Sequence, residues 1–208
     1  MKSSKKWKAR QQNDPYVRRA RAAGYRARAA FKLLELEQSD HLFKGVARVV
    51  DLGAAPGSWC QVARERLPAS AKVIALDILP MEAVPGVDFI LGDFREDDVL
   101  EALESTLEGR PVDLVLSDMA PNISGIGPAD QARSMHLAEL ALEFAGQWLE
   151  KNGTLVVKVF QGAGFDELLT ELRQSFQSVK VRKPAASRTE SREVYLVASG
   201  LKHPTRHG

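Results

Sequence analysis

The fold of this chain is decided by one stretch of sequence, Val49-Val50-Asp51-Leu52-Gly53-Ala54-Ala55-Pro56-Gly57-Ser58-Trp59. Its apolar start predicts a strand, the two glycines predict a tight turn, and the amphipathic residues from Ser58 onward predict a helix. Because glycine has no Cβ, Gly53 and Gly57 allow a ligand to approach the backbone closely. The start of the helix adds unpaired N–H groups. We therefore expect a cofactor site at the carboxyl end of this strand.

Strand and helix patterns alternate along the chain after residue 45. We expect strands over 47–51, 72–77, 87–91, 112–117 and 153–159, and helices over 58–67, 95–107, 130–150 and 164–175. Such alternation predicts a parallel sheet with helices on both faces. Two final apolar runs, Ser178–Arg182 and Val194–Ser199, are joined only by a polar turn region, so one of these strands should be antiparallel. The expected α/β fold, a Rossmann-like and mostly parallel seven-stranded sheet with one antiparallel strand, resembles that of S-adenosylmethionine-dependent methyltransferases.

Charge is distributed unevenly along the 208 residues. Residues 1–32 carry eleven Lys/Arg and one acid, Asp14, for a formal charge of +10, whereas the rest of the chain carries −8. We expect this basic segment to bind a polyanion such as RNA, with a solvated tail as the alternative. Aromatic residues that can stack on unpaired bases lie among these charges, namely Trp7, Tyr16, Tyr25 and Phe31.

The chain divides into three expected parts. Residues 1–17 are expected to form a flexible basic tail, and residues 202–208 a C-terminal tail. Between them, residues 18–201 are expected to form a methyltransferase domain that begins with a basic helical segment over 18–45. Within this segment, Ala20–Leu36 is rich in Ala, Arg and Leu and contains no proline, which predicts a helix.

Cysteine content and hydropathy indicate the cellular compartment in which the protein is expected. A single cysteine, Cys60, excludes an intrachain disulfide and a cysteine metal cluster, and it is typical of a reducing compartment. No apolar run approaches the roughly 18 residues of a membrane span, and the N-terminal residues lack the apolar core of a secretory signal. We therefore expect a cytoplasmic protein that does not associate with membranes, and a monomer by default.

The glycine loop and two acids distinguish between nucleotide cofactors. A nicotinamide dehydrogenase needs G-x-G-x-x-G against a pyrophosphate, whereas residue 55 is Ala and the loop contains no Lys or Arg. Asp77 and Asp93 end the next two expected strands, where one carboxylate can accept from ribose hydroxyls and the other from an adenine amino group. Each acid could instead cap a helix, and Trp59 could belong either to the core or to the wall of an adenosine pocket. We favour an adenosine cofactor without a pyrophosphate.

Two further strand ends supply candidate catalytic groups. Asp118 follows the strand expected over 112–117 and precedes a proline turn, at the mouth of the cofactor crevice. That turn lacks the Asn/Asp-Pro-Pro-aromatic sequence of base-amine methylation, and Cys60 fits a core residue better than the thiolate that pyrimidine C5 methylation needs. Lys158 interrupts the apolar strand 153–159. Since a buried unpaired ammonium is costly, it is ion-paired, or reaches the surface, or acts as a neutral general base.

Four motifs, in matching order and spacing, resemble those of the FtsJ family of ribose 2′-O-methyltransferases. They are Asp51–Gly57, Ser117–Asn122, Val157–Gly162 and Ser191–Tyr195, and the resemblance runs from about Asp14 to Leu201. It implies transfer of a methyl group from S-adenosylmethionine to the ribose 2′-hydroxyl of a uridine in large-subunit ribosomal RNA, without a metal ion. Two other hypotheses are kept: a ribosome-assembly factor that binds RNA without catalysis, and a dehydrogenase.

The resemblance also implies roles for individual residues. The Lys-Asp-Lys-Glu tetrad of the family falls on Lys32, Asp118, Lys158 and Glu193. Lys158 is then the general base, Lys32 disfavours a second ammonium beside it, and the two acids balance the charge and hold the lysines. Without the resemblance, Lys32 would be interpreted as one more solvated helix lysine. The cofactor contacts of the family fall on Gly57, Trp59, Asp77, Asp93 and Asp118.

Overall fold

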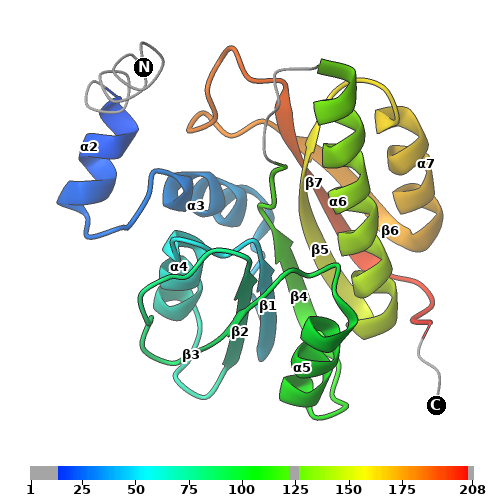
Figure 1. Cartoon of the computed structure of the whole chain (residues 1–208), viewed down its shortest axis with the longest axis horizontal. Helices are drawn as coiled ribbons and strands as arrows, with labels where there is room; N and C mark the ends of the chain where they lie inside the picture. The colour runs from blue at the N-terminus through cyan, green and yellow to red at the C-terminus, as the bar shows by residue number, and fades with distance from the viewer. Residues whose placement is uncertain (1–13, 122–126, 206–208) are drawn as a thin grey trace.

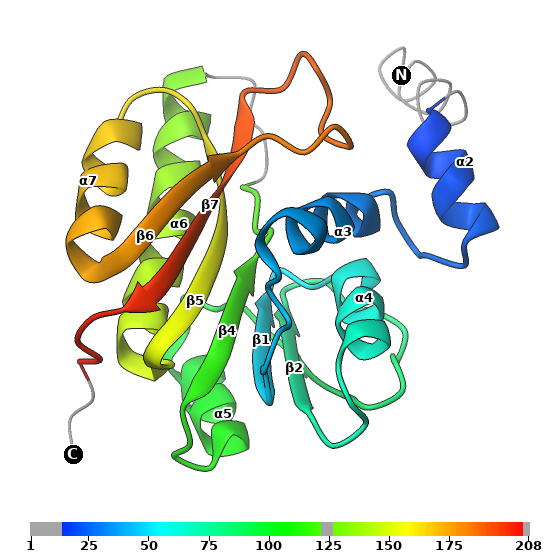
Figure 2. The ribbon, with the colours of Figure 1, turned by 180° about the vertical axis from the view of Figure 1, so that it is seen from behind.

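The computed structural model describes residues 14–121 and 127–205, which form a sheet with helices packed on both faces (Figures 1 and 2). The seven strands are β1 (Arg48–Leu52), β2 (Lys72–Asp77), β3 (Val87–Leu91), β4 (Val112–Ser117), β5 (Leu149–Phe160), β6 (Phe176–Arg182) and β7 (Glu193–Leu201). Their order in the sheet is β3-β2-β1-β4-β5-β7-β6. β7 is antiparallel to its neighbours β5 and β6, and the other pairs are parallel. The expected fold class is therefore confirmed.

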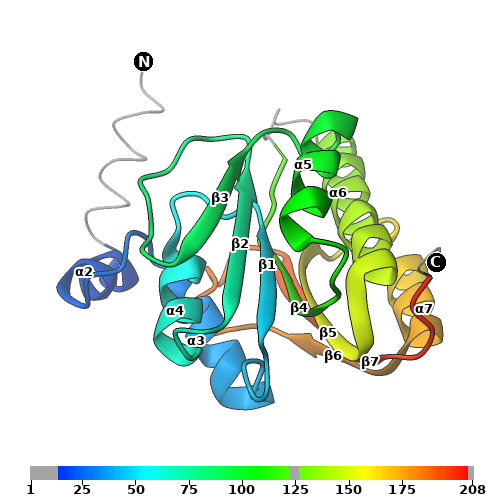
Figure 3. The ribbon, with the colours of Figure 1, turned by 90° about the horizontal axis from the view of Figure 1, so that it is seen from below.

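Helices cover the two faces of the sheet as the alternating pattern predicts. The helices of the described residues are α2 (Pro15–Ala22), which contacts α3, and α3 (Ala29–Asp40), α4 (Ser58–Arg66), α5 (Asp97–Leu107), α6 (Gly127–Trp148) and α7 (Phe165–Ser175). α3 and α4 pack on one face, with Val49 and Leu114, while α5, α6 and α7 pack on the other, with Val50 and Val115 (Figure 3). The helix expected over 130–150 stops earlier, because β5 starts at Leu149. No helix in the described ranges is long and apolar enough to cross a membrane.

The N-terminal segment differs from its prediction. Instead of one helix over Ala20–Leu36, it forms α2 and α3 with residues 23–28 between them. Helix propensity alone favours a continuous helix, but Gly24 takes a φ of 80° and the chain turns there. The expected boundary between tail and domain, after residue 17, falls inside α2, and residues 1–13 lie outside the described part of the chain.

Aromatic rings fasten α2 to α3. The ring centroids of Tyr16 and Tyr25 lie 5.8 and 5.9 Å from that of Phe31. The guanidinium carbon of Arg19 lies 4.7 Å from the Phe31 centroid, in a cation–π contact. Phe31 therefore packs against both tyrosine rings, and the stacking of these residues on bases stays a prediction. Trp7, the fourth aromatic residue of the segment, lies outside the described residues.

A buried carboxyl group lies at the end of β1, beneath the glycine loop. Asp51 is 1 % exposed, and its Oδ2 accepts a hydrogen bond of 3.3 Å from the Cys60 thiol. Among the described residues, Oδ1 has no hydrogen-bond partner. Burial, helped by the nearby Asp118 and Asp77 carboxylates, raises the pKa of Asp51 to about 7. Cys60 itself is fully buried, as expected of a core residue.

This raised pKa predicts a pH-dependent stability that Asp51→Asn removes. Below pH 7 the folded protein keeps Asp51 neutral, whereas an unfolded chain ionises it near pH 4. Because only the unfolded chain gains from ionising Asp51 between these two pKa values, the free energy of unfolding should fall by on the order of 2 kcal/mol as the pH rises from about 5 to 8, and level off above the folded pKa. Urea unfolding of the wild type and of Asp51→Asn at both pH values measures this. Equal pH dependence in the two proteins would contradict the assignment.

Candidate active site

The loops that follow β1 and β4 meet at the carboxyl edge of the sheet. The Asp118 N–H donates to the Leu52 carbonyl over 3.2 Å, so the two strand ends are joined by a backbone hydrogen bond. A Cβ added to Gly53 would lie 2.8 Å from Met119 Cγ and 3.0 Å from its Cα. Gly53 is therefore needed for contact between the two loops, in addition to any approach of a ligand.

Gly57 likewise makes room for neighbouring protein atoms. It takes a φ of 101° immediately before α4. A Cβ added there would lie 2.8 Å from Nη1 of Arg26, 3.2 Å from Val84 and 3.3 Å from Met81. The loop itself contains no Lys or Arg, as its sequence says, but the fold brings Arg26 beside it. No side chain of the described residues caps the start of α4, so its first N–H groups can serve an anionic ligand group.

Asp77 holds the glycine loop in place. It is 9 % exposed, its Oδ2 accepts a hydrogen bond of 2.8 Å from the Ala55 N–H, and its Oδ1 accepts one of 2.8 Å from the Leu79 N–H. The chain passes from β2 to β3 without a helix, so Asp77 does not cap one. Each carboxylate oxygen has two lone pairs, and both oxygens can therefore accept a further hydrogen bond from a ligand.

Asp93 is paired with a neighbouring arginine. Its Oδ2 lies 2.5 Å from Nη2 of Arg95, and its Oδ1 accepts a hydrogen bond of 3.0 Å from the Arg95 N–H. These hydrogen bonds hold the pKa of Asp93 below its usual range. Glu96, rather than Asp93, is the residue that precedes α5. A ligand amino group at this position would share the Asp93 carboxylate with Arg95.

The side chain of Trp59 belongs to the core, which decides between the two alternatives for this residue. Trp59 is 2 % exposed, and its indole N–H donates to the Ala29 carbonyl over 2.8 Å. Its ring lies 5.8 Å from that of Tyr195. The indole thus joins α4 to α3 and β7 instead of lining the cofactor crevice. What Trp59 can offer a ligand is its backbone N–H in the first turn of α4.

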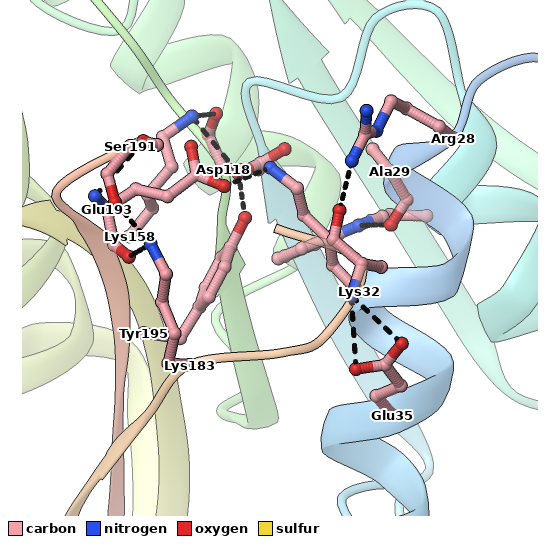
Figure 4. Close-up of polar contacts among 12 residues, drawn as sticks. Arg28, Ala29, Lys32, Glu35, Asp118, Lys158, Lys183, Ser191, Glu193 and Tyr195 are labelled. Carbon is pink, nitrogen blue, oxygen red and sulfur yellow. Dashed lines mark hydrogen bonds and ion pairs between the residues drawn. The ribbon is translucent and has the colours of Figure 1, made fainter. Parts of the chain in front are cut away.

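Lys158 and Asp118 form an ion pair that is largely shielded from water (Figure 4). Nζ of Lys158 lies 3.1 Å from Oδ1 of Asp118 and donates to the Asp118 carbonyl oxygen over 2.7 Å. The two side chains are 8 % and 18 % exposed. Of the alternatives for Lys158, the ion-paired arrangement is the one observed. Its nitrogen is fixed beside the mouth of the crevice by two acceptors from the same residue.

A second ion pair joins α3 to β7. Nζ of Lys32 lies 2.6 Å from Oε1 of Glu193, with both side chains little exposed. Burial alone would raise the pKa of Glu193, but the charge of Lys32 and, more weakly, that of Lys158 hold it below its usual range. Glu193 is therefore ionised, and Lys32 is not a solvated helix lysine. The structure brings all four tetrad residues together.

Tyr195 links the two pairs, and sequence reasoning gave it no role. It is fully buried, its hydroxyl donates to Oδ1 of Asp118 over 2.7 Å, and Nζ of Lys32 lies 5.8 Å from its ring centroid. Burial, with the charges of Asp118 and Glu193, raises the pKa of Tyr195 well above its usual value, so the hydroxyl remains a donor. Strand register was the available signal, because Tyr195 pairs with Lys158 across β5 and β7.

The loop between β6 and β7 is fastened to α3, close to the second ion pair (Figures 1 and 2). Lys183 donates from Nζ to the Glu193 carbonyl over 2.7 Å. Glu35 of α3 accepts a hydrogen bond of 3.1 Å from the Ala186 N–H, and Arg28 donates to the Ala186 carbonyl (Figure 4). The side chains of Arg28, just before α3, and of Glu35 within α3 therefore fix the loop that precedes Glu193. No group of three or more His, Cys, Asp or Glu in the described ranges could hold a metal ion.

Comparisons with known proteins agree with this geometry. The sequence pattern of the FtsJ-like methyltransferases matches residues 25–201. Curated relatives named "Ribosomal RNA large subunit methyltransferase E" include one from Methylobacillus flagellatus, 57% identical over 200 residues and 96% of each chain. Another, from Azoarcus sp., is 58% identical over 201 residues, 97% of this chain and 98% of the relative.

Among solved structures, a Plasmodium falciparum chain described as a ribosomal RNA methyltransferase matches with a TM-score of 0.75 and 34% sequence identity. The match covers 86% of this chain and 100% of the other. The shared sheet, the family pattern over most of the chain and the identity to full-length relatives lead to one conclusion. The chain belongs to the FtsJ-like methyltransferase family.

Proposed function

We propose that the protein transfers a methyl group from S-adenosylmethionine to the ribose 2′-hydroxyl of a uridine in large-subunit ribosomal RNA. The observation that carries this proposal is the buried Lys158–Asp118 pair beside the Lys32–Glu193 pair, at the edge of the sheet where the cofactor crevice is expected. The names of the relatives support the substrate class. We place the activity in the cytoplasm, with the monomer as the working unit.

The residues at this edge fit an adenosyl cofactor that lacks a pyrophosphate. Asp77 has acceptor capacity left for ribose hydroxyls, and Asp93 can share its carboxylate with an adenine amino group. The backbone at Gly57 and Trp59 offers the uncapped start of α4 to a carboxylate. When bound, S-adenosylmethionine supplies an electrophilic methyl group on a positively charged sulfur, a charge that the nearby Asp118 carboxylate would stabilise.

Lys158 is the group placed to accept the proton of the attacking hydroxyl. Its nitrogen must be free of its own extra proton before it can act as a base. The Asp118 carbonyl and carboxylate hold that nitrogen in position, and the Tyr195 hydroxyl holds the carboxylate. Orientation of the ribose by this rigid set would supply much of the rate enhancement.

Lys32 and Glu193 act beside this centre. The Lys32 ammonium is held by Glu193 within the same buried region, where it would disfavour a second positive charge on Lys158. A non-catalytic assembly factor would have no need for two buried lysine–carboxylate pairs, whose formation requires desolvation of four charged groups. A dehydrogenase would not need them either, and it would need a pyrophosphate loop that the chain lacks.

Lys158→Met should abolish methyl transfer while leaving the cofactor site intact. Removing a general base costs roughly 10²–10⁴-fold in rate, and methionine keeps the unbranched shape of the buried side chain and all but its terminal atom. Transfer of a radioactive methyl group to large ribosomal subunits, and to RNA extracted from them, measures this. Lys151→Met, at an exposed position of the same strand, is the matched control. Near wild-type turnover by Lys158→Met, with cofactor binding retained, would refute the assignment.

Tyr195→Phe tests the link between the two ion pairs. The ring stays, but Oδ1 of Asp118 loses a hydroxyl donor at 2.7 Å. Hydrogen bonds to charged groups contribute on the order of 1.5–3 kcal/mol, so we expect kcat to fall about tenfold or more. The KM for S-adenosylmethionine should change little, because the ring does not line the crevice. Unchanged kcat would show that the Tyr195 hydroxyl does not position the Asp118–Lys158 pair.

A further inference from the structure

Arg26 connects the N-terminal arm to the loops of the cofactor site. The N-terminal arm, residues 14–40, comprises α2, the segment 23–28 and α3. Nη1 of Arg26 donates to the Pro56 carbonyl over 3.0 Å and to the Glu82 carbonyl over 2.6 Å, and Nη2 donates to the Ala83 carbonyl over 2.8 Å. Pro56 lies in the loop after β1, whereas Glu82 and Ala83 lie in the loop after β2. One guanidinium therefore bridges both loops.

The backbone of the same segment is fastened to the first helix of the cofactor site. The Arg26 N–H donates to Oε1 of Gln61 over 2.9 Å, and Nε2 of Gln61 donates to the Gly24 carbonyl over 3.0 Å. Gln61 lies in the first turns of α4, which starts at the glycine loop. Segment 23–28 thus contacts the cofactor site through both its backbone and its side chain.

Gly57 and Arg26 form a complementary pair. A Cβ on Gly57 would lie 2.8 Å from Nη1 of Arg26. The absence of a side chain at Gly57 therefore leaves space for the guanidinium. Within the part of the chain that the structure describes, the hydrogen-bond partners of this guanidinium are backbone carbonyls rather than carboxylates. A planar fork with several fixed donors can span carbonyls from two loops, which a single ammonium cannot do equally well. This geometry indicates a role in spacing the loops more than in neutralising charge.

Two simpler roles for Arg26 are less consistent with these contacts. As one more RNA-binding cation it would present its donors to solvent, yet both terminal nitrogens bond to protein carbonyls. As a general stabiliser it could contact any part of the domain, yet among the described residues its carbonyl acceptors all lie in the two loops at the carboxyl ends of β1 and β2. Ligands of open α/β sheets bind outside these ends.

We propose that Arg26 is a positioning residue for cofactor binding, whose guanidinium holds the loops after β1 and β2 at the spacing that the adenosyl cofactor requires. This inference rests on the proposed cofactor. It also connects two parts of the site, because the segment that carries Arg26 leads directly into α3 and Lys32. The same piece of chain then places both the cofactor loops and a tetrad lysine.

Binding of S-adenosylhomocysteine by titration calorimetry tests the proposal without requiring turnover. For Arg26→Ala we expect the Kd to rise about tenfold or more, given the contribution of charged hydrogen bonds. Arg26→Lys should fall between this variant and the wild type, and Gln61→Ala, which loosens the segment but keeps the guanidinium, should shift the Kd in the same direction. Arg110→Ala is the matched control, an exposed arginine before β4 at the other end of the sheet.

Chemical rescue separates positioning from a merely structural role. Guanidinium ions at millimolar concentration should restore part of the cofactor affinity of Arg26→Ala and leave that of Arg110→Ala unchanged. Thermal unfolding of each variant checks that it is folded. If Arg26→Ala does not fold, the cofactor affinities of Gln61→Ala and Arg26→Lys test the proposal instead. Affinity for extracted large-subunit ribosomal RNA should stay within about twofold of wild type.

Three results would decide against the inference or its basis. Wild-type cofactor affinity in Arg26→Ala would overturn it. So would a loss of RNA affinity with cofactor affinity unchanged, because Arg26 would then act on the substrate. Failure of the wild-type protein itself to bind S-adenosylhomocysteine would refute the proposed function, and the variants would not be needed to see it.

Discussion

The constraint on which the rest of the structure depends is the placement of two lysines out of water at the carboxyl edge of the sheet. A buried ammonium is tolerated only with well-placed acceptors, and loss of one partner leaves an uncompensated charge. Lys158 has the carbonyl and carboxylate of Asp118, and Lys32 has Glu193. These pairs can form only if β4, β5, β7 and α3 are all in place. The candidate site therefore forms only when these elements of the fold have assembled.

The N-terminal arm contacts the candidate active site at several points and does not stand apart from it. Aromatic contacts join α2 to α3, and the indole of Trp59 donates to a carbonyl of α3. Arg26 reaches the loops after β1 and β2, while Lys32 reaches Glu193. A basic segment expected to bind RNA thus also contacts both halves of the site. Substrate, cofactor and proton acceptor would then be organised by neighbouring residues of one segment.

Sequence reasoning predicted the sheet, its antiparallel strand and the strand-end residues Asp77, Asp118 and Lys158, because hydropathy period and strand ends are local signals. Sequence reasoning wrongly predicted one continuous helix through Gly24, because helix propensity is a weak guide where the chain can form a turn instead. Features that depend on packing between distant parts of the chain could not be predicted from the sequence. Arg26 contacts backbone carbonyls 30 to 57 residues away in the chain, and backbone acceptors leave no signature in a sequence. Family resemblance, not pattern, pointed to Lys32 and Glu193.

The central claim is that this protein methylates a ribose 2′-oxygen in large-subunit ribosomal RNA. The most direct measurement is nucleotide-resolution mapping of 2′-O-methyl groups in that RNA, from cells with and without the gene for this protein. The account predicts one uridine whose 2′-O-methyl group is present with the protein and absent without it. An unchanged map, or a lost methyl group that proves to be on a base, would contradict the account.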